Sequence, residues 1–464
     1  MIVEYQPGPT HSRPDPPTTL AQVEATWKRW FAGKDLYPLH AVLGTIAANH
    51  LPGDPVWLML VGGSGTGKTE AVLAGNRIPH THPISLVTGP AALLSATPKK
   101  DRTGQATGGV LRQVGDFGII AIKDFTSTLS MHREARAEVL SALREVYDGA
   151  WDRLTGSEGG QVLSWSGKVG MVAGCTSVID SAHAFISSMG DRWLMARMPD
   201  LDRHDQSHRS IGHAGREGRM HSEIQEAVAG LFRSGPPHQA PELTETEVDC
   251  LVILADLASL ARSPVQRDYR GEIELVLDPE APTRIAKQLA QLYRGLRSVG
   301  LDRATTWTTV ARAGLDCIPK LRRAVIHCLD SGGQATTTTV AEAVEHPTTT
   351  TRRALEDLAA HRVVLRTGGG QGKADLWSLT PKAAAALQAI RTFSETSEGA
   401  TGDDRFSPDF PPSKEFRNIE DDKTEKVAGV QNGPLGRKRC PVGHRCNQPP
   451  SGSLVCCGQP EAGS

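Results

Sequence analysis

Short apolar runs without polar alternation recur along the first half of the chain, separated by segments of helical period. Such runs are typical of strands buried on both faces of a parallel sheet. Helical period appears over residues 19–50 and most clearly over Arg133–Tyr147. We therefore predict a parallel sheet with helices between its strands. The predicted strands are Val56–Val61, Ile84–Thr88, Gly118–Asp124 and Val169–Thr176.

A different pattern follows the helix of residues 133–147. Trp, Leu and Val alternate over Trp151–Trp165 around a Gly-rich turn, which predicts a β-hairpin. Residues 200–245 are polar, and we interpret them as a connector with one helix, Met220–Phe232. Helical period returns over residues 243–330.

The last ordered part of the chain has a pattern of its own. Lys320–Asp330 is predicted as a helix, Thr337–Val344 as a short helix with hydroxyl caps, and Thr348–Ala360 as a longer helix. Two apolar segments around a Gly-rich turn, residues 363–366 and 376–379, predict a second hairpin. This order predicts a small unit of three helices and a two-stranded wing.

Composition limits what the chain can be. Its 464 residues are enough for about two or three domains. The net charge is −1, so nucleic-acid contact would need local basic patches. Four cysteines scattered in apolar segments are typical of reduced thiols, which favours a cytoplasmic location. No apolar run approaches a membrane span and no signal peptide is visible, so no membrane partner is expected.

A glycine-rich motif follows the first predicted strand and precedes a helical segment. Residues 62–69 fit the pattern G-x-x-x-x-G-K-[ST], in which glycines let successive backbone N–H groups point at phosphate oxygens. Lys68 is expected to reach the β- and γ-phosphates of ATP, and the Thr69 hydroxyl to bind Mg²⁺. The expected nucleotide-binding residues are Gly62, Gly63, Ser64, Gly65, Thr66, Gly67, Lys68 and Thr69.

Asp124 ends the apolar strand that begins at Gly118. In phosphate-loop (P-loop) NTPases a carboxylate at this position helps to hold Mg²⁺, and its strand is expected beside the strand of the glycine-rich motif. Asp124 is therefore the second expected Mg²⁺ residue, with Thr69. The alternative is an ordinary exposed Asp at the end of a strand.

The order of these features resembles a known family. A P-loop, a strand ending in Asp, a helix, a hairpin, a strand ending in hydroxyls and then Arg beside an aromatic residue is similar to the AAA+ ATPases that carry a hairpin before their sensor-1 strand. The resemblance covers about residues 36–330 and implies a homo-oligomer built through the ATPase core, with ATP at the subunit interface.

The resemblance also implies roles for single residues. Thr176, or Ser177, would be sensor 1, which positions the attacking water. Arg192 would be the arginine finger presented to a neighbouring subunit, and Arg284 the sensor-2 arginine that reaches the γ-phosphate. With Lys68 and Asp124, these residues form the expected catalytic set. For each arginine the alternative is a surface ion pair.

One departure from the family puts hydrolysis in question. The family usually follows the strand-terminal Asp with Glu, the general base, whereas Phe125 stands here. Glu70 or Glu134 could substitute. Otherwise hydrolysis should be slow, and ATP would act mainly as a binding switch.

The helices and wing after residue 320 resemble the winged helix-turn-helix of MarR-like and ArsR-like regulators, which implies DNA as a partner. The helix Thr348–Ala360 would enter the major groove. The alternative is a winged unit used for protein contact, because Glu356 and Asp357 dilute the positive face. The expected DNA-binding residues are Thr349, Thr350, Arg352, Arg353, Arg366 and Lys373.

The predicted fold is thus an α/β P-loop NTPase core, a parallel sheet with helices on both faces, followed by a helical lid, a winged-helix domain and a disordered tail. The tail contains Cys440, Cys446, Cys456, Cys457 and His444, whose spacing fits no familiar zinc pattern. The expected domains are a leader 1–18, the ATPase core 19–200, lid and connector 201–315, the winged unit 316–392 and the tail 393–464.

Three functions remain open at this point. The chain is expected to be a DNA-associated ATPase of replication or mobile-element maintenance. The alternative is an ATP-switched transcription regulator with little turnover. A protein-remodelling ATPase is a third possibility. The missing Glu after Asp124 favours the switch, whereas the hairpin over residues 151–165 favours the motor.

Overall fold

The computed structural model describes residues 17–31, 33, 35–96, 108–156, 160–181, 192–200, 202–235, 241–368 and 374–397. Contacts divide the chain into two units, Met1–Glu415 and Phe416–Ser464, and every described residue belongs to the first. The cysteine-containing tail and nearly all of the expected leader lie outside the described residues.

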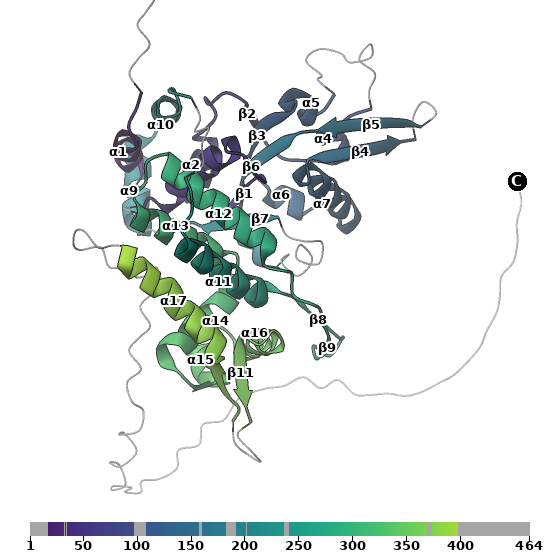
Figure 1. Ribbon diagram of the computed structural model, residues 1–464, viewed down its shortest axis with the longest axis vertical. Coiled ribbons are helices and arrows are strands. Elements are labelled where there is room, and N and C mark those ends of the chain that lie inside the picture. The colour runs from purple at the N-terminus through teal and green to yellow at the C-terminus, as the bar shows by residue number, and fades with distance from the viewer. Residues whose placement is uncertain are drawn as a thin grey trace, which may run out of the picture. The chain divides into compact units, whose positions relative to one another are not determined.

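A five-stranded parallel sheet organises the described residues (Figure 1). Its order is β2-β3-β6-β1-β7, and each neighbouring pair is parallel. The C-terminal ends of its strands therefore share one end of the sheet, where the P-loop follows β1. The strands are β1 (Trp57–Val61), β2 (Thr81–Ile84), β3 (Phe117–Ile122), β6 (Lys168–Cys175) and β7 (Trp193–Arg197).

Helices and smaller sheets surround these strands. A two-stranded hairpin, β4 (Ala150–Thr155) and β5 (Gln161–Ser166), precedes β6 as predicted. The helices up to that hairpin are α1 (Leu20–Trp30), α2 (Tyr37–His50), α3 (Lys68–Leu73), α4 (Pro90–Leu93), α5 (Val110–Val114), α6 (Thr126–Leu129) and α7 (Arg133–Tyr147). Those between β7 and the C-terminal unit are α9 (Arg203–His213), α10 (Glu217–Leu231), α11 (Glu245–Arg262), α12 (Thr283–Ser298) and α13 (Arg303–Asp316).

Two expectations about the strands are wrong. The second strand is predicted over residues 84–88, whereas β2 ends at Ile84. It is an edge strand that contains His82 and Pro83, so no apolar run marks it in the sequence. The strand that leads to Asp124, β3, does not pair with β1, because β6 lies between them.

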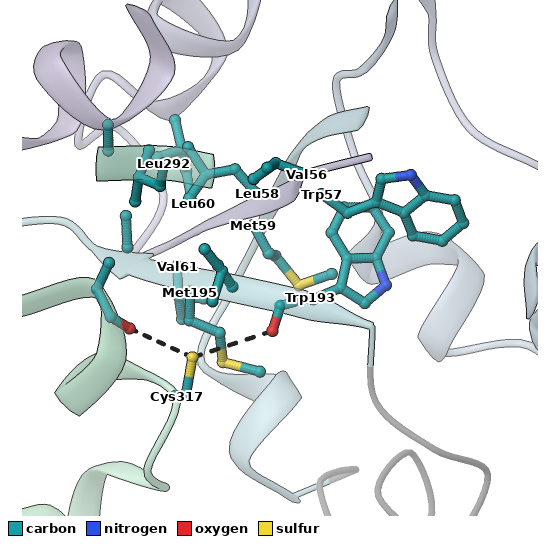
Figure 2. Close-up of a cluster of buried hydrophobic side chains, with 14 of the residues drawn as sticks. Val56, Trp57, Leu58, Met59, Leu60, Val61, Trp193, Met195, Leu292 and Cys317 are labelled. Atoms are coloured by element: carbon teal, nitrogen blue, oxygen red, sulfur yellow. Dashed lines mark hydrogen bonds between the residues drawn. The ribbon is translucent and has the colours of Figure 1, made fainter. Parts of the chain in front are cut away.

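The strand β1, which lies between β6 and β7, is buried along its whole length (Figure 2). On one face, the ring of Trp57 lies 5.1 Å from that of Trp193 and 5.2 Å from that of Tyr147 on α7. On the other face, Gly170 and Gly174 of β6 lie against side chains of α2 and α3. Helices therefore cover both faces, as predicted, and the buried side chains each stabilise the sheet by roughly 1.5–3 kcal/mol.

Helix α2 fixes the start of β1. The buried Asn49 side chain donates to Val56 O and accepts from Val56 N, both at 2.9 Å. Helix α12 crosses α2 where two glycines meet, since a Cβ on Gly295 would lie 2.1 Å from Gly44 O. Only glycines allow this approach, so α12 is held directly against the core.

The segment between β7 and α11 differs from the prediction. It contains two helices, α9 and α10, rather than one. We predict residues 201–315 as a lid and connector, but α12 packs along α2 and α13 packs against β7, so both helices belong to the core. A short hairpin, β8 (Val265–Arg267) and β9 (Ile273–Val276), joins α11 to α12 and is absent from the prediction.

The C-terminal unit has three helices and a three-stranded antiparallel sheet of order β10-β12-β11, and a fourth helix, α17, follows this sheet. Helix α16 has the predicted bounds, whereas α17 continues five residues past the expected start of the tail at residue 393. The elements are α14 (Lys320–Gly332), β10 (Ala335–Thr336), α15 (Thr337–Ala343), α16 (Thr348–Ala360), β11 (Val364–Thr367), β12 (Leu376–Leu379) and α17 (Pro381–Ser397).

Candidate nucleotide-binding site

The P-loop, residues 62–69, connects β1 to α3 at the C-terminal end of the sheet and is exposed or half-buried throughout. Gly62 N donates to Cys175 O at 3.1 Å, which joins the loop to the end of β6. Gly65 and Gly67 have φ of +80° and +82°, a conformation that strains other residues. The loop therefore has the open backbone that phosphate binding requires.

Lys68 lies within this loop and donates to Gly63 O. Burial lowers the pKa of the Lys68 ammonium, while Cys175, Asp124 and Glu70 act in the opposite direction. An anionic ligand would compensate a half-buried cation at this point.

The Asp124 carboxylate is held by the start of α6. It accepts hydrogen bonds from Thr126 N at 2.9 Å and from the Ser127 hydroxyl. Burial raises the pKa of Asp124, but these hydrogen bonds outweigh it and the pKa lies below its usual value. The carboxylate is therefore kept ionised, as a Mg²⁺ ligand or water-holding group must be.

These oxygens fit Mg²⁺ in the way that nucleotide-bound Mg²⁺ is held. Among the described residues, no group of three or more His, Cys, Asp or Glu side chains forms a metal site. Mg²⁺ at phosphates needs only one or two protein oxygens, because phosphates and water supply the others. The exposed Thr69 hydroxyl and the ionised Asp124 meet that requirement.

Thr176 follows the last residue of β6 and faces the same end of the sheet. Its backbone N–H donates to the Thr126 hydroxyl at 2.9 Å. Its own hydroxyl oxygen is buried and has no hydrogen-bond partner among the described residues. A buried, unpaired hydroxyl costs about 1–3 kcal/mol, which makes it a natural partner for a water or phosphate oxygen.

The general base expected after Asp124 is replaced by a core residue. The Phe125 ring is 1% exposed and lies 5.2 Å from the ring of Trp193. Of the two substitutes, Glu70 lines the cavity over the P-loop and lies 3.6 Å from His221. Glu134 is exposed at the start of α7.

A cavity of about 380 Å³ lies over the outer part of the P-loop. Its walls come from residues 65–70, from Trp30 and Phe31 at the end of α1, and from α9 and α10. Gln206 of α9 donates to Gly65 O at 2.5 Å, and Arg209 donates to Phe31 O at 3.3 Å. The described residues of α9 are all outside the core, so this helix covers the loop without being packed into the fold.

A second cavity, of about 190 Å³, lies on the other side of the P-loop beside Gly62, Gly63 and Ser177. Its cationic lining is Arg197, Arg312, Lys320 and Arg323, from β7, α13 and the first turn of α14. The sequence prediction missed these residues. A basic cluster at the start of α14 is visible in the sequence, but only the tertiary fold brings it to the P-loop.

Arg192 and Arg284 lie at the N-terminal end of the sheet, away from the chain's own P-loop. Arg192 precedes β7, is 9% exposed and pairs with Asp148 at 2.9 Å. Arg284 pairs with Glu280 and lines a cavity of about 650 Å³ with Lys168, the first residue of β6. The strand β1 separates this end from the P-loop by roughly 16 Å. The expectation that Arg284 reaches the γ-phosphate therefore fails within one chain, because α12 runs along α2.

The candidate DNA-binding residues of α16 are exposed. Thr349, Thr350, Arg352 and Arg353 are all exposed on its N-terminal half. Arg366 on β11 pairs with Asp375 at 2.5 Å, and Lys373 lies outside the described residues.

The acidic residues of α16 are neutralised. Glu356 pairs with Arg267 at 3.1 Å and with Arg352 at 2.9 Å. Asp357 pairs with Arg267 at 2.5 Å and with Arg322 at 2.7 Å.

Within the described part of the chain, no helix is long and apolar enough to cross a bilayer.

Comparisons with known proteins add the following. No family model and no curated protein sequence matches the chain. A solved protein from Cytophaga hutchinsonii, named for a suspected ATPase activity, is 11% identical with a TM-score of 0.38, over 70% of this chain and 93% of that one. Drosophila ORC bound to DNA is 11% identical with a TM-score of 0.22, over 83% and 96%. Aeropyrum pernix ORC1 in complex with DNA is 15% identical with a TM-score of 0.19, over 80% and 92%. At such TM-scores the likenesses carry no argument, so the case rests on the site itself.

Proposed function

We propose that the chain is a DNA-associated ATPase of the AAA+ type, with ATP and Mg²⁺ bound at the P-loop. The observation that carries the proposal is the open loop at residues 62–69, with Lys68 inside it and the ionised Asp124 at the same end of the sheet. Backbone amides, a cation and a carboxylate in this arrangement suit a nucleoside triphosphate with its metal.

The site's parts then have separate roles. The N–H groups of the loop and Lys68 would bind the β- and γ-phosphates. Thr69 and Asp124 would hold Mg²⁺, which would supply positive charge to the phosphates. The adenine ring of ATP would lie in the 380 Å³ cavity beside Trp30 and Phe31. The unpaired Thr176 hydroxyl orients the water that attacks the γ-phosphate.

Because Phe125 occupies the usual place of the general base, we expect slow turnover. Of the two candidate substitutes, Glu70 directly follows the P-loop, whereas Glu134 lies at the start of α7. If neither Glu70 nor Glu134 acts as base, ATP serves as a switch rather than as fuel, which is the second candidate function: an ATP-switched transcription regulator.

Arg192 and Arg284 would act between subunits. Their position at the opposite end of the sheet suits residues that meet a neighbour's nucleotide rather than their own. The 650 Å³ cavity beside Arg284 gives room for the neighbour's P-loop end. The Arg192–Asp148 pair would open when a neighbouring γ-phosphate competes with the carboxylate.

The C-terminal unit, α14 to β12, would be a winged helix that binds DNA. Its element order supports this proposal, with α16 as the recognition helix and β11–β12 as the wing. The carboxylates that argue against DNA are each paired with two arginines, so they no longer oppose a phosphate backbone. Thr349, Thr350, Arg352 and Arg353 would contact the groove, and Arg366 and Lys373 the backbone.

Steady-state ATPase measured without DNA, with single-stranded DNA and with duplex DNA tests the proposal. DNA-stimulated turnover supports a motor or loader. Nucleotide binding without turnover supports the regulator. Lys68→Ala should lower turnover about 100-fold or more, because the triphosphate loses its cation. Unchanged turnover in that variant would contradict the site.

A further inference from the structure

Two consecutive arginines of α14 reach in different directions. Arg323 pairs with the fully buried carboxylate of Asp316 and lines the 190 Å³ cavity beside the P-loop. Arg322 instead pairs with Asp357 of α16 at 2.7 Å and donates to Ser263 O, also at 2.7 Å. One turn of α14 therefore contacts both the 190 Å³ cavity beside the P-loop and the candidate recognition helix α16.

The first turn of α14 is tied to the sheet. Lys320 N donates to Asp180 Oδ1 at 3.2 Å. Arg197, the last residue of β7, binds both oxygens of the same carboxylate at 2.7 and 2.8 Å. The backbone N–H of Arg197 also donates to Asp316 Oδ2 at 2.7 Å. The helix start, the end of β7 and the segment after β6 thus form one hydrogen-bonded cluster beside Gly62 and Gly63.

The cationic side chains of this cluster differ in whether they have a carboxylate partner. Arg197 and Arg323 have carboxylate partners in the chain. Lys320 is exposed at the mouth of the cavity, so its ammonium is available to a ligand. Phosphate oxygens placed beside Gly63 would attract Lys320 and compete with Asp316 for Arg323. A triphosphate extends further along this side than a diphosphate, so ATP and ADP would bind α14 differently.

We propose that α14 reads the terminal phosphate through Lys320 and Arg323 and transmits the nucleotide state to α16 through the Arg322–Asp357 pair. The inference rests on the proposed nucleotide site. Arg322 is 12% exposed and Asp357 15%, so the pair is shielded from water and links the two helices directly. A ligand shifts α16 only if its interaction free energy differs between two states of the protein, and contacts of ATP, but not of ADP, with the first turn of α14 would supply such a difference.

Amide hydrogen exchange on the full chain tests the inference without requiring DNA. We expect exchange of the α16 amides to differ at least about threefold between the complexes with Mg²⁺ and a slowly hydrolysed ATP analogue and with Mg²⁺-ADP. Nucleotide titration under the same conditions measures binding independently. If no nucleotide binds, the proposed function fails. If both nucleotides bind and α16 exchanges equally, the inference is overturned.

Two variants test whether the nucleotide state is transmitted to α16 through Arg322. Arg322→Gln should keep nucleotide affinity, because Arg322 does not line the cavity, and should abolish the exchange difference in α16. Arg267→Gln is the matched control, since Arg267 binds the same Asp357 from the β8–β9 hairpin and has no contact with the cavity. It should keep the difference. The reverse result would assign transmission to the hairpin and overturn the role of α14.

Lys320→Ala tests whether Lys320 contacts the terminal phosphate. It should lower the preference for ATP over ADP about tenfold, the scale of one charge-assisted hydrogen bond, and should leave ADP affinity unchanged. An equal loss for both nucleotides, or no loss, would contradict contact between Lys320 and the terminal phosphate.

Discussion

Polar groups at the C-terminal end of the sheet differ in whether they have a hydrogen-bond partner within the chain. The Asp124 carboxylate and the Thr176 backbone N–H have partners within the chain. The Thr176 hydroxyl is buried without a partner among the described residues. If this hydroxyl orients the attacking water, as proposed, its removal should change turnover and stability in opposite directions.

Thr176→Val replaces that hydroxyl with a methyl group of the same shape. The free protein should be as stable as the wild type or more stable by up to about 1 kcal/mol, because an unpaired buried oxygen is removed. Turnover of ATP should fall about 10- to 100-fold, because the attacking water loses its partner. Thermal unfolding and steady-state ATPase check the two halves. Thr176→Ser should retain activity. A variant that loses stability and keeps activity would contradict the assignment.

Lys168 gives a prediction for pH. Its Nζ donates to Leu51 O at 2.6 Å, and burial lowers the pKa of Lys168 from 10.5 to about 8, against the effect of Asp54. Between these values the unfolded chain holds the proton that the folded chain releases, so the free energy of unfolding rises with pH. Below pH 8 the folded state carries the full cost of the buried charge.

Lys168→Met should remove that cost. At pH 7 it should raise the free energy of unfolding by about 1–2 kcal/mol, a value reduced because water screens a partly exposed ammonium. The slope between pH 8 and 10 should flatten. Urea unfolding at several pH values measures both, and an unchanged slope would show that Lys168 keeps its ordinary pKa.

At the scale of elements, long periodic segments were predictable and short or polar ones were not. Helices α7 and α16 have the predicted bounds because their apolar faces are long and regular. The two-stranded β8–β9 hairpin is short, and most of its residues are exposed, so no pattern marks it. Helix α9 is polar and its described residues bury nothing, yet it covers the P-loop.

The candidate site shows the same limit. The P-loop and Asp124 could be found because each has a local signature. The place of Arg284 could not, because it depends on how α12 packs against α2. Lys320 and Arg323 reach the P-loop only because α13 packs on β7 and directs α14 to the same end of the sheet.

The crossing of α2 and α12 gives a prediction for stability. Gly295→Val should destabilise the chain by about 3 kcal/mol or more, because the new side chain would lie against Gly44 O and Ala48. Gly218→Ala on α10 is the matched control. A Cβ there meets nothing within 4 Å, so alanine should stabilise by about 0.5–1 kcal/mol. Urea unfolding compares the two. A tolerated valine at residue 295 would contradict the close helix crossing.

At the scale of the whole molecule, candidate functional residues lie at both ends of the sheet. The P-loop is at one end, and Arg192 with Arg284 at the other. If each site is completed by a neighbouring subunit, Lys68→Ala and Arg192→Ala should each be inactive alone. Mixing them should restore part of the activity, since intact P-loops of one variant meet intact arginines of the other. Absence of rescue by a folded mixture would show that Arg192 does not act between subunits.

Every role proposed for the site requires that residues 62–69 bind a nucleoside triphosphate. Calorimetric titration of the full chain with Mg²⁺-ATP, beside Lys68→Ala and a control, Lys382→Ala, measures this binding. Lys382 lies on α17, where it pairs with Asp256 at 2.7 Å and lines none of the three cavities described above. We predict binding by the wild type and Lys382→Ala and a loss of at least about 100-fold in Lys68→Ala. Equal affinity in all three proteins, or no binding by the wild type, would contradict the account.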